Sequence, residues 1–308
     1  MDNGEFAYFE GRIVPTEDAN INIMTHAFNY GTGVFEGIRA YWNDDNKQLN
    51  IFRLDEHIDR MMRSFRVLCI DPGLSFDEIR EILVDVTRKN GFKDDVYIRP
   101  IGYKSSYELG PKVHGLDDEF AVYVIRLGDY VDISKGLGVT VSSWRRLRDN
   151  AIPVRCKING SYVNSALAAT EAKESGFDEA IFLCEDGTVS EGSAMNVFLV
   201  QDGNLVTPPC TADILVGITR NTVMQIAREK LGIETASRPV GRTELYTSDE
   251  VFFCGTGAQV APVTQVDRRP VGDGNPGEVT LAIQKLYFDV AQGRIAEYRH
   301  WLTPVYES

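Results

Sequence analysis

Three side chains of complementary chemistry follow one another in the middle of the 308-residue sequence. Lys157 offers an amine, Tyr162 a phenol and Glu191 a carboxylate. A nucleophilic amine, together with a phenol and a carboxylate, is the set of groups that a pyridine-aldehyde cofactor needs around its ring. The chain has ten lysines, so the residue types alone leave a surface lysine as the alternative for Lys157.

The local pattern predicts the elements that position these groups. Lys157 ends a short apolar, strand-like run, and a helix is predicted over about 162–175. An apolar strand over 179–184 reverses at the Asp186-Gly187 turn and leads to Glu191. The amine, the phenol and the carboxylate are therefore expected on three adjoining elements.

Length and composition set the class of protein. A chain of 308 residues predicts about two domains with ample core. Its 43% hydrophobic and 25% charged residues are typical of a soluble globular protein. The net charge of −13 argues against nucleic-acid binding, which needs a basic face. No run approaches the roughly 18 apolar residues of a membrane span, and the acidic N-terminus lacks the apolar core of a signal peptide.

The cysteines and histidines give no sign of disulfides or metal. The five cysteines are odd in number and scattered, which favours a reducing, cytoplasmic location. Neither a CxxC nor an HxxxH spacing occurs, so no metal site is expected.

The first half of the chain predicts an α+β domain. A hairpin over 7–14 is followed by helices over 53–68 and from the Ser75–Glu78 capping box to about residue 91. In the strand predicted over 96–101, Tyr97 and Arg99 share one face. This pair is a candidate receptor for a carboxylate, and a solvated edge strand is the alternative.

The domain boundary is predicted at a linker-like stretch. We expect an N-terminal domain over 1–127, an interdomain loop over 128–136 and a C-terminal domain over 137–308 that carries Lys157.

Three segments are candidates for holding an anion. Arg60 lies on an early turn of the first long helix, the LVGITR run (215–220) precedes a helix, and CGTG (254–257) follows a strand. N–H groups at a helix N-terminus and in a glycine turn attract anions. Alone, each is ordinary helix or turn chemistry, but together they are what a phosphate needs.

The sequence resembles the branched-chain aminotransferases of the fold-type IV pyridoxal-phosphate enzymes. The resemblance covers nearly the whole chain and rests on several motifs in order: NYGTGVFEGIR, FRLDEHIDR, YIRP, the lysine segment, VSEGSAMNVF, LVGITR and FCGTGAQVAPV. It implies a two-domain α+β fold like that of D-amino acid aminotransferase, pyridoxal 5'-phosphate as cofactor, and a homodimer or an assembly of dimers.

The resemblance also assigns roles by motif. Lys157 resembles the Schiff-base lysine, Tyr162 the phenol that hydrogen-bonds the ring oxygen, and Glu191 the carboxylate that faces the pyridine nitrogen. The remaining cofactor positions match Arg60, Leu215, Ile218, Thr219 and Thr256. The substrate positions match Tyr30, Phe35, Gly37, Tyr97, Arg99, Tyr130, Gly257 and Ala258.

The implied activity is a reversible ping-pong transfer of the amino group of L-leucine, L-isoleucine or L-valine to 2-oxoglutarate, through a pyridoxamine form. Such an enzyme serves branched-chain amino-acid biosynthesis. Its partners are small-molecule substrates, with no nucleic acid and no membrane.

Two segments depart from the pattern and keep alternatives open. The loop Tyr103–Gly110 and the turn Gly255–Ala258 differ from the usual forms. A D-amino acid aminotransferase is disfavoured because the Arg-x-His of that family is missing: Lys112 and Val113 precede His114. An (R)-amine transaminase and an aminodeoxychorismate lyase share the fold. A non-catalytic binding protein is the alternative of another class, and the joint presence of the site residues argues against it.

Overall fold

The computed structural model describes residues 2–128 and 135–306, and these form two compact units. Unit 1 holds the described parts of Met1–Gly128 and Asp289–Ser308, together with Cys156–Gly160. Unit 2 holds the described part of Asp129–Arg155 together with Ser161–Phe288. No helix in these described ranges is both long enough and apolar enough to cross a membrane.

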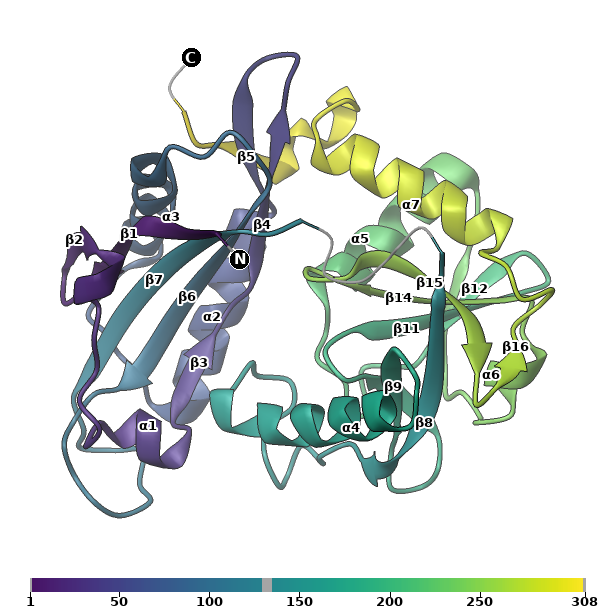
Figure 1. Cartoon of the computed structure of the whole chain (residues 1–308), viewed down its shortest axis with the longest axis horizontal. Helices are drawn as coiled ribbons and strands as arrows, with labels where there is room; N and C mark the ends of the chain where they lie inside the picture. The colour runs from purple at the N-terminus through teal and green to yellow at the C-terminus, as the bar shows by residue number, and fades with distance from the viewer. Residues whose placement is uncertain (1, 129–134, 307–308) are drawn as a thin grey trace. The chain divides into compact units, whose positions relative to one another are not determined.

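Unit 1 is an antiparallel sheet with two long helices. Its elements are β1 (Asp2–Phe9), β2 (Arg12–Pro15), η1 (Thr16–Asp18), α1 (His26–Tyr30), β3 (Gly33–Phe35), β4 (Ile38–Asn43), β5 (Gln48–Phe52), α2 (Leu54–Leu68), α3 (Phe76–Asn90), β6 (Val96–Lys104), β7 (Asp118–Arg126), η4 (Ala296–Trp301) and β17 (Leu302–Pro304). The described strands run in the order β17-β5-β4-β6-β7-β1-β2, and β3 pairs with β6. The helix α3 packs against β1 and β7, and α2 packs against β3 and α3 (Figure 1).

The local predictions for unit 1 are confirmed. Ala7 lies opposite Val14 in the β1–β2 hairpin. The Ser75 side chain accepts from the Glu78 N–H while the Glu78 carboxylate accepts from the Ser75 N–H, so the capping box is complete. Burial alternates along the first residues of β6, as expected for a strand with one covered face.

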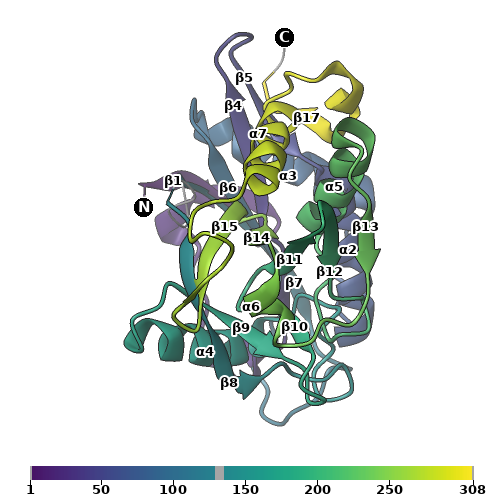
Figure 2. The same ribbon diagram turned by 90° about the vertical axis from the view of Figure 1, so that its right-hand side faces the viewer.

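Unit 2 is a mixed sheet with helices. Its elements are β8 (Leu137–Arg145), η2 (Asn159–Ser161, which begins in unit 1), α4 (Tyr162–Glu174), β9 (Glu179–Leu183), β10 (Val189–Gly192), β11 (Asn196–Gln201), β12 (Asn204–Thr207), α5 (Ile218–Ile226), its continuation η3 (Ala227–Leu231), β13 (Thr235–Ser237), α6 (Glu244–Thr247), β14 (Glu250–Gly255), β15 (Gln259–Val266), β16 (Arg269–Pro270) and α7 (Glu278–Ala291, whose last turn is in unit 1). The described strands run in the order β10-β9-β8-β15-β14-β11-β12-β13, and β16 pairs with β15. Figure 2 shows α4 beside β8 and β9, against which it packs.

Hydrophobic side chains from several strands close one face of the unit 2 sheet. Val139 on β8, Ile181 on β9, Val197 on β11 and Phe253 on β14 are all fully buried in one cluster. Burial of this kind contributes about 1.5–3 kcal/mol for each large apolar side chain. The site segments described below begin or end at these strands.

The structure differs from the sequence predictions around Lys157. Residues 151–157 form turns, bends and irregular chain rather than a strand, and the next residue, Ile158, makes an isolated β-bridge to Val34 of β3. The segment Cys156–Gly160 therefore packs with unit 1, although the sequence predicted it within the C-terminal domain. The end of the chain does the same, because β17 pairs with β5.

Candidate active site

Lys157 is held in unit 1 by its own backbone. Its carbonyl accepts from the Phe35 N–H at 3.0 Å, and its N–H donates to the Ser64 hydroxyl at 3.4 Å. The half-buried side chain places Nζ 4.9 Å from the centre of the Phe35 ring. The amine is thus fixed beside an aromatic surface.

Four of the predicted substrate residues of unit 1 form one cluster around the same ring. The Arg99 guanidinium lies 4.3 Å from the centre of the Phe35 ring, and its Nη2 donates to the Tyr97 hydroxyl at 2.8 Å. Gly37 makes room for that hydroxyl, since a Cβ on Gly37 would lie 2.0 Å from it. Lys157 and Arg99 therefore share the surface of Phe35.

Tyr30 lies at the C-terminal end of α1, next to the atypical loop. Its hydroxyl accepts from the Gly110 N–H at 2.9 Å, and its ring centre is 4.6 Å from that of His26. His26 Nε2 in turn contacts the Gly110 carbonyl at 3.0 Å. Tyr103, predicted to open the loop, instead lies within β6 and is buried.

A buried ion network underlies the N-terminal half of α2. Arg60 donates through Nε and Nη2 to both oxygens of Glu36, at 2.6 and 2.7 Å, and His57 Nδ1 lies 2.8 Å from Glu36 Oε2. Burial opposes ionisation of Glu36, but Arg60 and His57 outweigh it and hold the pKa of Glu36 well below its ordinary value. For His57, burial has the opposite effect and lowers the pKa, because it disfavours the charged imidazolium. Arg60 is therefore a buried cation already neutralised by a carboxylate, not a solvated helix charge.

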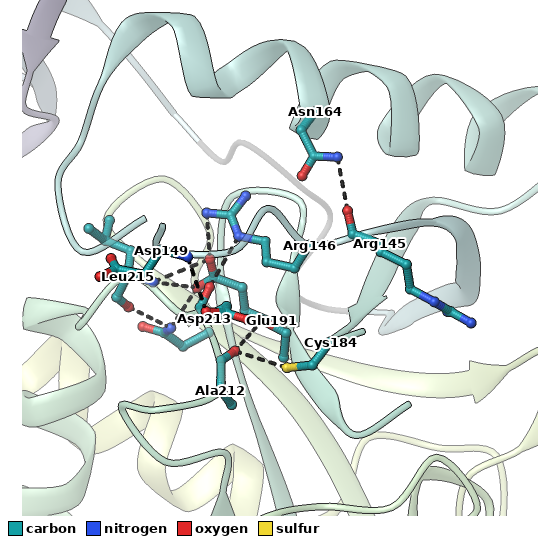
Figure 3. A network of polar contacts seen from close by, with 11 residues as sticks. Arg145, Arg146, Asp149, Asn164, Cys184, Glu191, Ala212, Asp213 and Leu215 are labelled. Atoms are coloured by element: carbon teal, nitrogen blue, oxygen red, sulfur yellow. Dashed lines mark hydrogen bonds and ion pairs between the residues drawn. The ribbon is translucent and has the colours of Figure 1, made fainter. Parts of the chain in front are cut away.

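Glu191 lies in β10 of unit 2, one residue before its end, and is surrounded by donors (Figure 3). Arg146 Nη2 lies 2.8 Å from Oε1, Asn196 Nδ2 donates to Oε2 at 3.0 Å, and the Leu215 N–H reaches both oxygens at 3.2–3.3 Å. The Glu191 and Arg146 side chains are 5% and 8% exposed. An ionised carboxylate held in this way is a fixed negative charge inside the unit.

The N-terminus of α5 follows directly from the loop that contacts Glu191. Its N-cap is Gly217, which offers no side-chain acceptor to the first turn, and Ile218 and Thr219 are buried. Arg220 is 3% exposed, and it donates only to neutral oxygens of Thr207, Pro208 and Ser237 among the described residues. The helix dipole and this guanidinium place positive charge at one end of α5.

The predicted carboxylate turn joins β14 to β15. Residues 256–258 form the turn between the paired ends Gly255 and Gln259. The positive φ of this turn falls on Gln259, at 59°, and Gly257 does not adopt a positive φ. The unusual glycine at position 257 is therefore not required by the backbone conformation.

The remaining predicted residues are placed as follows. Tyr162 is the first residue of α4 and is half-buried. Tyr130 lies outside the described residues. Within the described chain, the predicted residues fall into a unit 1 group (Tyr30, Phe35, Gly37, Arg60, Tyr97, Arg99, Lys157) and a unit 2 group (Tyr162, Glu191, Leu215, Ile218, Thr219, Thr256, Gly257, Ala258).

Comparison with known proteins identifies the family. The model of the class IV amino-transferases matches residues 33–266, more than half of the chain. The chain belongs to the class IV aminotransferases. It is therefore a pyridoxal-phosphate-dependent transaminase. The roles of the unit 1 and unit 2 residues stay predictions from the sequence motifs.

Full-length relatives carry a more specific name. A probable branched-chain-amino-acid aminotransferase of Aquifex aeolicus is 48% identical over 303 residues, which cover 98% of this chain and 97% of the relative. The crystal structure of the branched-chain aminotransferase from the archaeon Thermoproteus uzoniensis with norvaline is 41% identical, with a TM-score of 0.94 over 98% of this chain and 100% of that one. A branched-chain amino acid aminotransferase from T.th., complexed with N-(5'-phosphopyridoxyl)-L-glutamate, is 39% identical, with a TM-score of 0.95 over 99% and 100%.

The residues of this class IV aminotransferase fit pyridoxal 5'-phosphate. The amine of Lys157 suits an aldehyde, and the buried Glu191 carboxylate suits a protonated pyridine nitrogen. The start of α5, which lacks a side-chain cap, suits a phosphate. The donor types match the three parts of the cofactor.

Sequence reasoning missed four residues of the site. Three of them are buried and contact a predicted residue directly: Glu36 contacts Arg60, and Arg146 and Asn196 contact Glu191. The fourth, Arg220, follows Thr219 in α5. Glu36, Asn196 and Arg220 stand inside the quoted motifs, and that position is the signal that could have found them. Arg146 belongs to the run SSWRRLRDN, in which nothing local distinguishes the buried arginine from its exposed neighbours.

Proposed function

We propose that this aminotransferase transfers the amino group of L-leucine, L-isoleucine or L-valine to 2-oxoglutarate. The observation that carries the proposal is that Lys157 and Arg99 both lie against the ring of Phe35. An apolar ring flanked by the Lys157 amine and the Arg99 guanidinium, at 4.9 and 4.3 Å, suits both an aliphatic side chain and a second carboxylate. The relatives bound to norvaline and to a glutamate adduct support these two kinds of substrate.

Each group has a distinct part in this reaction. When bound, pyridoxal 5'-phosphate supplies the aldehyde that accepts the amino group and the ring that accepts electrons. Lys157 Nζ takes the proton from the substrate Cα. Glu191, paired with Arg146 at 2.8 Å, would hold a proton on the pyridine nitrogen. The start of α5, Thr256 and Arg60 would hold the phosphate, and Tyr162 would hydrogen-bond the phenol oxygen of the ring.

Substrate selection follows from the cost of burying charge. Burying a carboxylate without a partner costs too much free energy, and so does burying an unpaired arginine next to a leucine side chain. Arg99 avoids both costs because it stays hydrogen-bonded to Tyr97 and stacked on Phe35 while an aliphatic chain is bound. It then receives the distal carboxylate of glutamate. Gly257 and Ala258 receive the carboxylate at Cα, and Tyr30 and Gly37 line the pocket. Tyr130, which lies outside the described residues, stays a predicted substrate residue.

A panel of amino donors tests the proposal. Both enantiomers of leucine, valine and alanine, together with (R)-1-phenylethylamine, are each assayed against 2-oxoglutarate. The L-branched-chain amino acids are expected to give the highest kcat/KM. A preference for a D-amino acid or for the amine would overturn the proposed specificity in favour of the alternatives with the same fold.

We further propose that the enzyme is a homodimer or an assembly of dimers. The support is a surface of unit 1 on which large apolar side chains are exposed: Ile21, Ile23, Met24, Phe28, Tyr107 and Leu109. The two segments are tied together by the His26 N–H, which donates to the Ser106 carbonyl at 3.0 Å. Exposed apolar patches of this kind are typical of protein interfaces. The cytoplasmic location stays a prediction.

Light scattering on a sizing column tests the assembly. Ile23→Asp and Phe28→Asp, at side chains that are 78% and 65% exposed, are expected to shift the enzyme toward monomer, because a charge would be buried at the interface. Val67→Asp, at an exposed apolar residue on α2, is the matched control. A monomeric parent protein would contradict the proposal.

A further inference from the structure

Asn196 occupies a central place among the cofactor segments of unit 2. It is 5% exposed and is the first residue of β11. Its Nδ2 donates to Glu191 Oε2 at 3.0 Å and to the Leu215 carbonyl at 2.9 Å. Its backbone lies opposite Cys254, two residues before Thr256. One side chain thus joins the carboxylate of β10 to the loop that leads into α5.

The orientation of the Asn196 amide is determined by its partners. Glu191 Oε2 and the Leu215 carbonyl are both acceptors, so only the NH₂ end of the amide can face them. Both amide hydrogens are then used, and the opposite end, Oδ1, points toward Gly217. An ideal Cβ on Gly217 would lie 2.0 Å from Oδ1. Any other residue at 217 would push the amide away from Glu191 or displace the loop.

We infer that Asn196 is a positioning residue that couples the ring-nitrogen end of the cofactor site to its phosphate end. The inference rests on the proposed function, which assigns Glu191 to the ring nitrogen and the start of α5 to the phosphate. Asn196 sets the distance between them, because one amide binds both the carboxylate and the 215–217 loop. Gly217 is the residue that permits this contact.

The coupling predicts that a substitution at either the ring-nitrogen end or the phosphate end lowers ligand affinity at both ends. Removing the amide in Asn196→Ala takes one donor from Glu191 Oε2, which keeps the Leu215 N–H, and takes the same donor group from the Leu215 carbonyl. A side chain with a purely local role would affect one end only. In Gly217→Ala, the added methyl group collides with the Asn196 amide, so a change in the loop reaches Glu191. When Asn196 is already alanine, the collision is absent.

Two probes separate the two ends in the apo protein. Inorganic phosphate reports on the start of α5, and pyridoxal, which lacks the phosphate, reports on the ring end. Their dissociation constants are measured by calorimetry or fluorescence for the parent, Asn196→Ala, Gly217→Ala and the double variant. Asn204→Ala, at an exposed asparagine of β12, and Gly138→Ala, where a Cβ meets nothing closer than 3.7 Å, are the matched controls.

The expected result is loss of affinity for both probes in each single variant, by about 10- to 100-fold, the size expected for losing a hydrogen bond to a charged group. The double variant is expected to bind each probe no more weakly than the single variant with the lower affinity for that probe. Asn196→Ser serves in the same comparison where Asn196→Ala does not fold. The controls are expected to match the parent.

Three outcomes would overturn the inference. These are normal phosphate affinity in Asn196→Ala, normal pyridoxal affinity in Gly217→Ala, and additive losses in the double variant. A parent protein that does not bind pyridoxal 5'-phosphate at all would instead contradict the proposed function, so the two failures are distinguishable.

Discussion

Replacing Glu36 with glutamine is expected to lower the free energy of unfolding more than the same replacement of an exposed, ion-paired glutamate does. The Glu36 side chain is 1% exposed and lies within 2.6–2.8 Å of Arg60 and His57. Glu36→Gln leaves the Arg60 guanidinium, whose side chain is 9% exposed, without its counter-charge. The neutral amide keeps the shape of the carboxylate, so the change isolates the charge.

Two estimates give the same magnitude. Opposite charges about 4 Å apart at an effective dielectric constant of about 20 attract by roughly 4 kcal/mol. Breaking one partner of a buried ion pair costs about 3–5 kcal/mol in measured cases. The free energy of unfolding is therefore expected to fall by about 3–5 kcal/mol in Glu36→Gln.

Urea unfolding of the apo protein measures the effect, with Glu56→Gln as the matched control. Glu56 pairs with Arg53 at 2.6 Å, but its side chain is 38% exposed, so its loss is expected to cost less than about 1 kcal/mol. Combining Glu36→Gln with Arg60→Met is expected to cost less than the sum of the two single changes, because each removes the same pair. If Glu36→Gln costs no more than Glu56→Gln, the buried network does not stabilise unit 1.

Four further predictions concern individual side chains. Arg99→Met is expected to cost the glutamate half-reaction about 2–5 kcal/mol of transition-state binding and the leucine half-reaction much less, as single-turnover rates will show; equal losses would mean that Arg99 only supports the pocket. Glu191→Gln is expected to raise the barrier to transamination by about 2–4 kcal/mol while the cofactor stays bound, and near-parental turnover would contradict its role. Arg220→Gln is expected to weaken phosphate binding to the apo protein more than Arg220→Lys does, since only lysine keeps the buried charge; equal affinities would show that Arg220 acts through its hydrogen bonds alone. Because burial lowers the pKa of His57 from 6.5, the unfolded chain takes up that proton first as the pH falls; stability is therefore expected to fall below about pH 6.5 with a slope of up to about 1.4 kcal/mol per pH unit from this residue, and His57→Gln should remove that part of the slope in a series of urea titrations.

Local signals in the sequence predicted most of the elements that carry the site. The Ser75 capping box, the turn at Gly187 and the start of α4 at Tyr162 depend on neighbouring residues alone, so they could be predicted. The segment that ends at Lys157 could not, because its conformation depends on a backbone bond to Phe35, far away in sequence. Its short apolar run is typical of a strand, and only the tertiary contact makes it a turn.

The ion-pair partners of the charged site residues also could not be predicted from the sequence. The sequence alone allows Arg60 to be an ordinary helix charge, and its burial against Glu36 depends on a tertiary contact. Arg146 looks like Arg145 and Arg148 in sequence, yet of the three only Arg146 is buried, against Glu191. The position of a charge along a helix or strand can be predicted from pattern, whereas the carboxylate that neutralises it comes from another element.

Reduction with borohydride before and after addition of L-leucine tests the central claim most directly. Peptide mapping of the protein reduced with its cofactor is expected to find the label on Lys157. Prior incubation with L-leucine in the absence of an oxo acid is expected to protect Lys157, because the Lys157 amine would then carry no reducible bond to the cofactor. Incubation with D-leucine is expected to leave the label in place. A label on another lysine, or protection by D-leucine and not by L-leucine, would contradict the account.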